Sequence, residues 1–171
     1  MRTDLLTNWL KGLRLAHIAH AQASSSDSWR HKVLGIPVVI LTTIVGTTVF
    51  SNLGEVPSET LKIATGLLSI GAVVLSSLQT FLSYATSAER HRTVALKYGA
   101  LRRELEQFLD DPPESKDAWT ATVEEFRTRW DAVDQEAPAV RQGVWRNAKL
   151  QLDRSLANGS ERDGAAVDDP A

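Results

Sequence analysis

The stretch VLGIPVVILTTIVGTTVFSNLG, residues 33–54, contains no charged side chain, and neither does IATGLLSIGAVVLSSLQTFLSYATSA, residues 63–88. The two stretches are 22 and 26 residues long. At about 1.5 Å of rise per residue, a helix of either length spans a hydrocarbon core of roughly 30 Å. The sequence therefore predicts two transmembrane helices. Two buried helices of a soluble protein are the alternative, but so small a chain lacks the layers that would cover them.

The connector between these stretches, residues 51–60, contains Gly54 and Pro57, which favour a tight turn. Ser58 followed by Glu59 is typical of a helix start. Two antiparallel helices joined in this way form a transmembrane hairpin.

Basic side chains near the outer ends of the hairpin predict its orientation. They are Arg30, Lys32, Arg90, Arg92, Lys97, Arg102 and Arg103, whereas the connector region holds only Lys62. Loops rich in Lys and Arg stay in the cytoplasm, so we expect a multi-pass protein of the inner membrane with both termini cytoplasmic.

Composition excludes several functional classes. The 171 residues give a formal net charge of -2, which provides no overall attraction to nucleic acid. Cysteine is absent, which rules out disulfides, a thiolate nucleophile and a Cys-ligated metal. His17 and His20 stand three residues apart, but no third ligand has suitable spacing, and no phosphate loop or catalytic motif is present. We therefore expect no enzyme activity, no cofactor and no metal.

The segments outside the membrane carry helical patterns. Residues 1–27 predict an amphipathic helix from Thr3 to about Ala23, which either lies on the inner membrane surface or packs on a cytoplasmic bundle. The run Ser24–Asp27 is expected to break it, with Asp27 or Ser28 capping the next helix. Residues 28–88 then form the transmembrane hairpin.

Residues 89–157 predict a cytoplasmic helical region, and residues 158–171 a disordered tail. The first cytoplasmic helix is expected to continue directly from the second span and to end at Asp110–Pro113. A second helix should begin near Ser115, and Pro138 should open a third. Large side chains repeat at coiled-coil spacing and should make bundle contacts within or between chains. They include Tyr98, Leu101, Leu105, Phe108, Trp119, Phe126 and Trp130. The expected fold is thus an all-α membrane protein with an N-terminal amphipathic helix, a transmembrane hairpin and a cytoplasmic helical bundle.

One face of the second span is small or polar at every position of a heptad stripe. Its members are Thr65, Ser69, Ala72, Ser76, Gln79, Ser83 and Thr86. Such a stripe suits either close packing between helices or the lining of a water-filled pore. A single hairpin cannot enclose a channel, so the pore interpretation requires a ring of chains, that is, a homo-oligomer.

The run AERHRTVALKYGALRRELE, residues 88–106, together with the preceding hairpin, resembles the SLATT family of two-transmembrane effectors associated with SMODS and SLOG domains. This resemblance implies a membrane effector of a bacterial conflict system, here antiphage defence. A separate partner protein or a diffusible nucleotide would trigger it, because the chain carries no nucleotidyltransferase or SLOG sensor.

The resemblance leads to a mechanistic hypothesis in which hairpins open a pore lined by Ser69, Ser76, Gln79 and Ser83. Arg90, Arg92, Lys97, Arg102 and Arg103 would contact lipid headgroups or receive the anionic signal. The alternative is a non-conducting, membrane-anchored scaffold that recruits partners to the inner leaflet.

Overall fold

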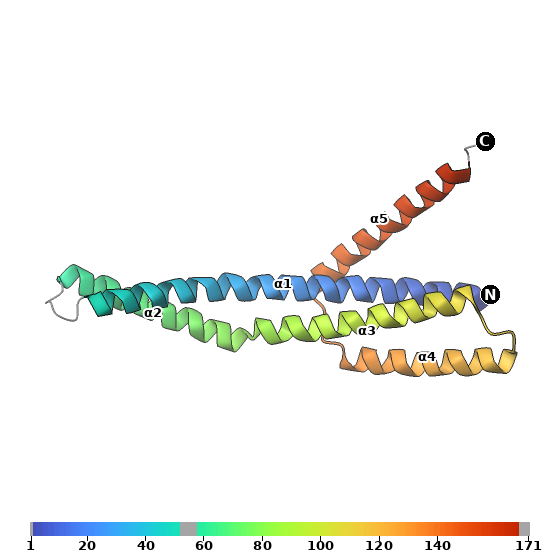
Figure 1. Cartoon of the computed structure of the whole chain (residues 1–171), viewed down its shortest axis with the longest axis horizontal. Helices are drawn as coiled ribbons and strands as arrows, with labels where there is room; N and C mark the ends of the chain where they lie inside the picture. The colour runs from blue at the N-terminus through green and yellow to red at the C-terminus, as the bar shows by residue number, and fades with distance from the viewer. Residues whose placement is uncertain (1, 52–57, 168–171) are drawn as a thin grey trace. The chain divides into compact units, whose positions relative to one another are not determined.

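The computed structural model describes residues 2–51 and 58–167, and within these ranges it contains α-helices and no strand (Figure 1). The helices are α1 (Arg2–Ser51), α2 (Glu59–Leu82), α3 (Tyr84–Asp110), α4 (Lys116–Glu136) and α5 (Gln142–Val167). The first apolar stretch lies in α1 as far as Ser51, and the second lies in α2 and the first turn of α3. The expected turn between them falls on residues 52–57, which lie outside the described residues.

Helix α1 continues without interruption through Ser24–Ser28, so the expected break there is wrong. Asp27 is not a helix cap, because its side chain is used in a tertiary contact. The residue is only 5% exposed, and its carboxylate accepts hydrogen bonds from Ser87 Oγ at 2.7 Å and from Arg30 at 3.2 Å. Serine costs a helix only a few tenths of a kcal/mol, about as much as other ordinary residues, so such contacts override a capping signal.

Helix α2 begins as the sequence predicts. Ser58 is its N-cap in an extended conformation, and its side chain accepts a hydrogen bond from the Leu61 amide at 3.4 Å. This contact satisfies one of the amides that a helix start leaves without an intrahelical partner.

The second apolar stretch is not one continuous helix. Helix α2 ends at Leu82, Ser83 adopts a left-handed conformation with φ 46° and ψ 35°, and α3 starts at Tyr84. The Ser83 hydroxyl donates to the Thr80 carbonyl at 3.0 Å, so the side chain bonds the preceding turn of the backbone. The expected heptad stripe therefore loses its register at Ser83.

The boundaries of α3 and α4 confirm the sequence prediction, since α3 ends at Asp110 and Ser115 is the N-cap of α4. Pro138 does not open the last helix. Residues 137–141 are not helical, and α5 starts only at Gln142.

Helix α5 continues to Val167, into the segment where the sequence predicts a disordered tail. Pro170 is the first proline after Pro138. No proline therefore interrupts the helix before its end.

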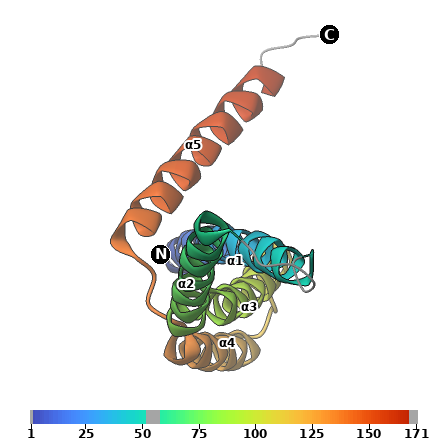
Figure 2. The same cartoon turned by 90° about the vertical axis from the view of Figure 1, so that its left-hand side faces the viewer.

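The helices form two compact units, which we call the bundle unit (Met1–Ser24 with Glu89–Ala171) and the hairpin unit (Ser25–Ala88). In the bundle unit, the first part of α1 lies beside α3, and α4 lies along α3 (Figures 1 and 2). Leu6, Leu13 and Ala16 of α1 belong to its core, so this segment packs on the bundle. The other buried core residues are Val94, Tyr98, Leu101, Leu105, Phe126 and Val133.

The hairpin unit has the opposite character, because its large apolar side chains are exposed. None of the most apolar window of α1 is buried, and only 6% of the corresponding window that begins in α2 is buried. Phe50 and Phe81, for example, are 76% and 84% exposed. These two helices are long and apolar enough to cross a membrane, and this chain does not cover them as it would cover core helices.

Candidate functional site

The small and polar stripe of α2 divides between the hairpin seam and the hairpin surface. Ala72 is buried, and Thr65, Ser69 and Gln79 are half-buried. The seam on this side also contains larger side chains, namely the half-buried Leu61, Leu68 and Leu75. Ser76, Ser83 and Thr86 are exposed. The structure thus brings together only part of the predicted stripe.

Gln79 shows how closely the seam packs. A Cβ atom added to Gly35 of α1 would lie 3.1 Å from Gln79 Nε2, so the glutamine side chain is seated directly against the glycine backbone. A polar amide in an apolar surrounding needs a protein neighbour, and the absence of a side chain at Gly35 makes room for it.

The hydroxyl groups of the two apolar helices largely bond their own backbone. Thr42 donates to the Val38 carbonyl at 2.8 Å and Thr43 to the Val39 carbonyl at 2.7 Å. Thr47, Thr48, Ser69, Ser77 and Thr80 make the same contact with the carbonyl four residues earlier. These hydrogen bonds satisfy the hydroxyl protons without water, which makes the helices compatible with a hydrocarbon environment.

Three exposed hydroxyls nevertheless lie on one side of the hairpin. Ser76 and Thr80 follow the seam residue Ala72 by four and eight positions, which turns them by about 40° and 80° around α2. Thr42 follows the half-buried Leu41 by one position, or about 100° around α1. Because α1 and α2 are antiparallel, a rotation in the same sense from the seam turns a residue of either helix toward the same face of the hairpin. Gly46 lies one turn after Thr42, and an added Cβ there would meet nothing within 4 Å. We call Thr42, Gly46, Ser76 and Thr80 the polar flank.

The five predicted basic contacts differ in their surroundings. Arg90, Arg92 and Arg103 are exposed, and Arg92 lies 3.9 Å from Glu89. Lys97 forms an ion pair with Glu136, and Arg102 Nε lies 3.7 Å from Glu106. The last two are therefore already engaged in ion pairs within the bundle unit.

The predicted bundle contacts all lie in the core cluster or pack against it, within one chain. Trp9 stacks on Phe126 at 6.3 Å between ring centroids and meets the edge of Trp130 at 5.7 Å. Phe108 and Trp119 pack at 6.1 Å. These aromatic contacts join α1, α3 and α4.

A buried polar cluster that sequence reasoning missed also joins these helices. His20 pairs with His91, not with His17, and their Nδ1 atoms lie 3.0 Å apart, so one ring donates and the other accepts. The two histidines are 3% and 5% exposed. The pKa of His20 is lowered to about 4, mainly by burial and also by the nearby His91, whereas Asp134 acts in the opposite direction. His20 is thus neutral near pH 7, and its partner, 71 positions away in the chain, could not be read from spacing.

Tyr98 extends this cluster toward α4. Its ring lies 5.4 Å from that of His20, and its hydroxyl donates to Asp134 Oδ1 at 2.6 Å. Burial raises the pKa of the Tyr98 phenol, and the hydrogen bond to Asp134 and the charge of that carboxylate raise it further. Tyr98 therefore acts as a hydrogen-bond donor and is not ionised.

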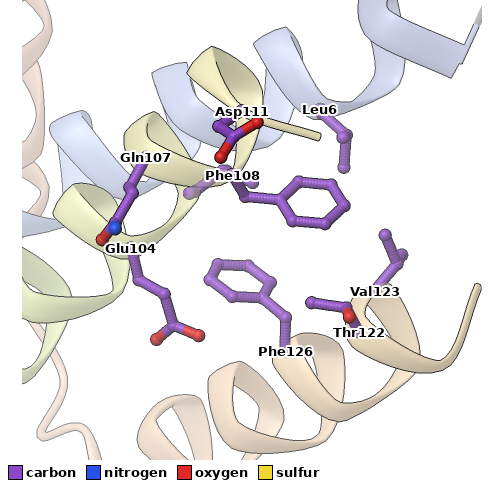
Figure 3. Close-up of a pocket in the computed structure, with 9 residues that line it drawn as sticks. Leu6, Glu104, Gln107, Phe108, Asp111, Thr122, Val123 and Phe126 are labelled. Atoms are coloured by element: carbon purple, nitrogen blue, oxygen red, sulfur yellow. The ribbon is translucent and has the colours of Figure 1, made fainter. Parts of the chain in front are cut away.

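Figure 3 shows a cavity of about 220 Å³ at one end of the bundle unit. The rings of Phe108 and Phe126 point into it, and Leu6 and Val123 complete its apolar wall. The carboxylate of Glu104 is held by two hydrogen bonds from Arg129, one of them 2.9 Å long. Asp111 also lines the cavity. We interpret this cavity as an incompletely filled part of the core, since most of its lining side chains belong to the core cluster or pack against it.

No group of three His, Cys, Asp or Glu side chains in the described part of the chain could hold a metal ion. In comparisons with known proteins, the chain matches no family model, no curated protein and no solved structure.

Proposed function

We propose that this protein is a membrane effector whose hairpins associate side by side and open a water-filled path when a signal acts on the bundle unit. The exposed apolar surface of the hairpin supports insertion into a bilayer. The observation that carries the proposal is the polar flank, because exposed hydroxyls and a glycine with open space beside it favour contact with another helix or with water.

In this proposal both termini and the bundle unit are cytoplasmic, at the inner membrane of a bacterium. The exposed Arg90, Arg92 and Arg103 would contact anionic lipid headgroups at the inner leaflet. The resemblance of residues 88–106 to the SLATT family supports a role in antiphage defence, with a partner protein or a diffusible nucleotide as the trigger.

Dye release from liposomes tests the pore, and two adjacent threonines provide a matched pair of variants. Thr42 and Thr43 are both exposed and both donate to the carbonyl four residues earlier in their own helix, but Thr43 lies about 100° away from the polar flank. We expect Thr42→Leu to reduce leakage at least about tenfold, because it lines the path with an apolar side chain. Thr43→Leu should leave leakage unchanged. Equal leakage from both variants would contradict a pore at this flank.

A non-conducting scaffold is the second candidate, and the seam favours it. Gln79 and Ala72, two central members of the polar stripe, are used in packing α2 against α1. If the full chain forms oligomers in detergent and recruits partners but releases no dye under any tested trigger, the scaffold is the correct function.

A further inference from the structure

A recess of about 450 Å³ lies in the bundle unit, between α1, α3, α4, the connection that follows α4, and the start of α5. Its volume falls within the range of ordinary small-molecule sites. Tyr98, Trp130 and Trp145 line it, together with the imidazole of His20 and the carboxylate of Asp134. Most of the remaining wall is apolar.

Two neighbours fix the position of Asp134 without neutralising it. Tyr98 OH and Trp130 Nε1 both donate to Asp134 Oδ1, at 2.6 Å and 3.1 Å. Both donors are uncharged, so neither of them supplies a positive charge to pair with this carboxylate. None of the ion pairs found among the described residues includes Asp134, and the basic group on Lys97 is paired with Glu136 instead.

The combination of a fixed carboxylate with aromatic walls selects for positive charge. Aromatic faces attract ammonium groups through their quadrupole, and a carboxylate without a basic partner adds a direct charge interaction. The same carboxylate repels anions. From this arrangement we propose that the recess binds a small organic ammonium ion, in contact with Asp134 and with the aromatic side chains. This site is independent of the proposed pore.

Choline and its uncharged isostere 3,3-dimethylbutan-1-ol test the proposal, because they share a shape and differ in charge. Titration calorimetry should use the full chain in a maltoside detergent, so that no choline headgroup competes. We expect saturable binding of choline, with an affinity at least about tenfold higher than that of the isostere. Equal affinities, or no binding of choline, would overturn the proposal.

Two variants locate the site. Asp134→Asn keeps an acceptor oxygen for Tyr98 and Trp130 but removes the charge, and should weaken choline binding at least about tenfold. Asp131→Asn is the control, because Asp131, like Asp134, is an exposed carboxylate of α4, but it lies 3.8 Å from Arg127 Nε and does not line the recess. Trp145→Ala removes one wall outside the core cluster, so it should weaken binding without unfolding the bundle unit. Unchanged binding in folded Asp134→Asn and Trp145→Ala proteins would show that choline binds elsewhere.

Discussion

At the scale of single residues, a close tertiary contact explains why glycine occupies position 99. Gly99 is buried in the middle of α3, where glycine normally destabilises a helix by about 1 kcal/mol relative to alanine. The imidazole of His17 explains its presence. An added Cβ would lie 3.0 Å from His17 Nδ1, and that nitrogen is fixed because it donates to the Ala95 carbonyl at 2.8 Å.

We therefore predict opposite effects for two glycine substitutions in the bundle unit. Gly99→Ala should lower the free energy of unfolding by about 1–3 kcal/mol, because the new methyl group overpacks His17. Gly12→Ala should raise it by up to about 1 kcal/mol, since its nearest neighbour, the Trp130 ring, would be 3.6 Å away. Urea denaturation of both variants measures the difference. A stabilising Gly99→Ala change would mean that His17 moves aside freely.

The residue scale also shows where sequence reasoning stops. The sequence predicts that Tyr98, Leu101 and Leu105 share a buried face, because helical spacing is a local property. It does not predict that His20 meets His91 or that Asp27 meets Ser87. Both pairs depend on how α1 lies along α3, and no short-range pattern encodes that placement.

At the scale of elements, the same contrast appears in helix boundaries. Ser58, Asp110 and Ser115 were predictable because a cap or a following proline acts within one turn. The continuity of α1 and the break at Ser83 were not predictable. Neither depends on a glycine or a proline, and both follow from hydrogen bonds of individual serine and aspartate side chains.

The break at Ser83 predicts that a serine-to-glycine substitution has opposite effects on the melting temperature at two positions of the hairpin. Ser83→Gly should raise the melting temperature of the full chain in detergent, because glycine adopts the left-handed conformation without the roughly 1 kcal/mol penalty of other residues. Ser77→Gly should lower it, because Ser77 is an exposed residue inside α2 and glycine weakens helix interiors. Destabilisation by both variants would argue that Ser83 is helical in the membrane.

At the scale of the whole molecule, apolar residues separate into an exposed hairpin and a buried bundle core. Sequence reasoning predicts this separation, because a charge-free stretch of more than twenty residues is visible without any knowledge of packing. Which residues of the polar stripe are buried depends on how α1 packs against α2. The sequence does not predict this packing, so only the structure shows which members of the stripe lie in the seam and which lie on the surface.

The buried histidine pair predicts how the stability of the bundle unit depends on pH. The pKa of His20 falls from its ordinary 6.5 to about 4 on folding, so the unfolded chain binds a proton more readily. The contribution of neutral His20 to the free energy of unfolding is fully present above pH 6.5. It decreases as the pH falls from 6.5 toward 4, by about 3 kcal/mol at most. The groups around His20 are His91 and Tyr98 from α3 and Asp134 from α4.

Urea denaturation between pH 4 and 7 measures this slope. His20→Gln should flatten it, whereas His31→Gln, which removes a histidine outside the pair, should keep it. A slope that is unchanged in His20→Gln would assign the acid sensitivity to carboxylates instead.

The perpendicular contact of Trp9 with Trp130 has a spectroscopic consequence. Two indoles held 5.7 Å apart at 82° couple their electronic transitions and produce an exciton couplet in ultraviolet circular dichroism. Because one chromophore is on α1 and the other on α4, the couplet vanishes when these helices separate. The protein therefore carries its own label-free optical reporter, readable in vesicles at the moment a trigger is added.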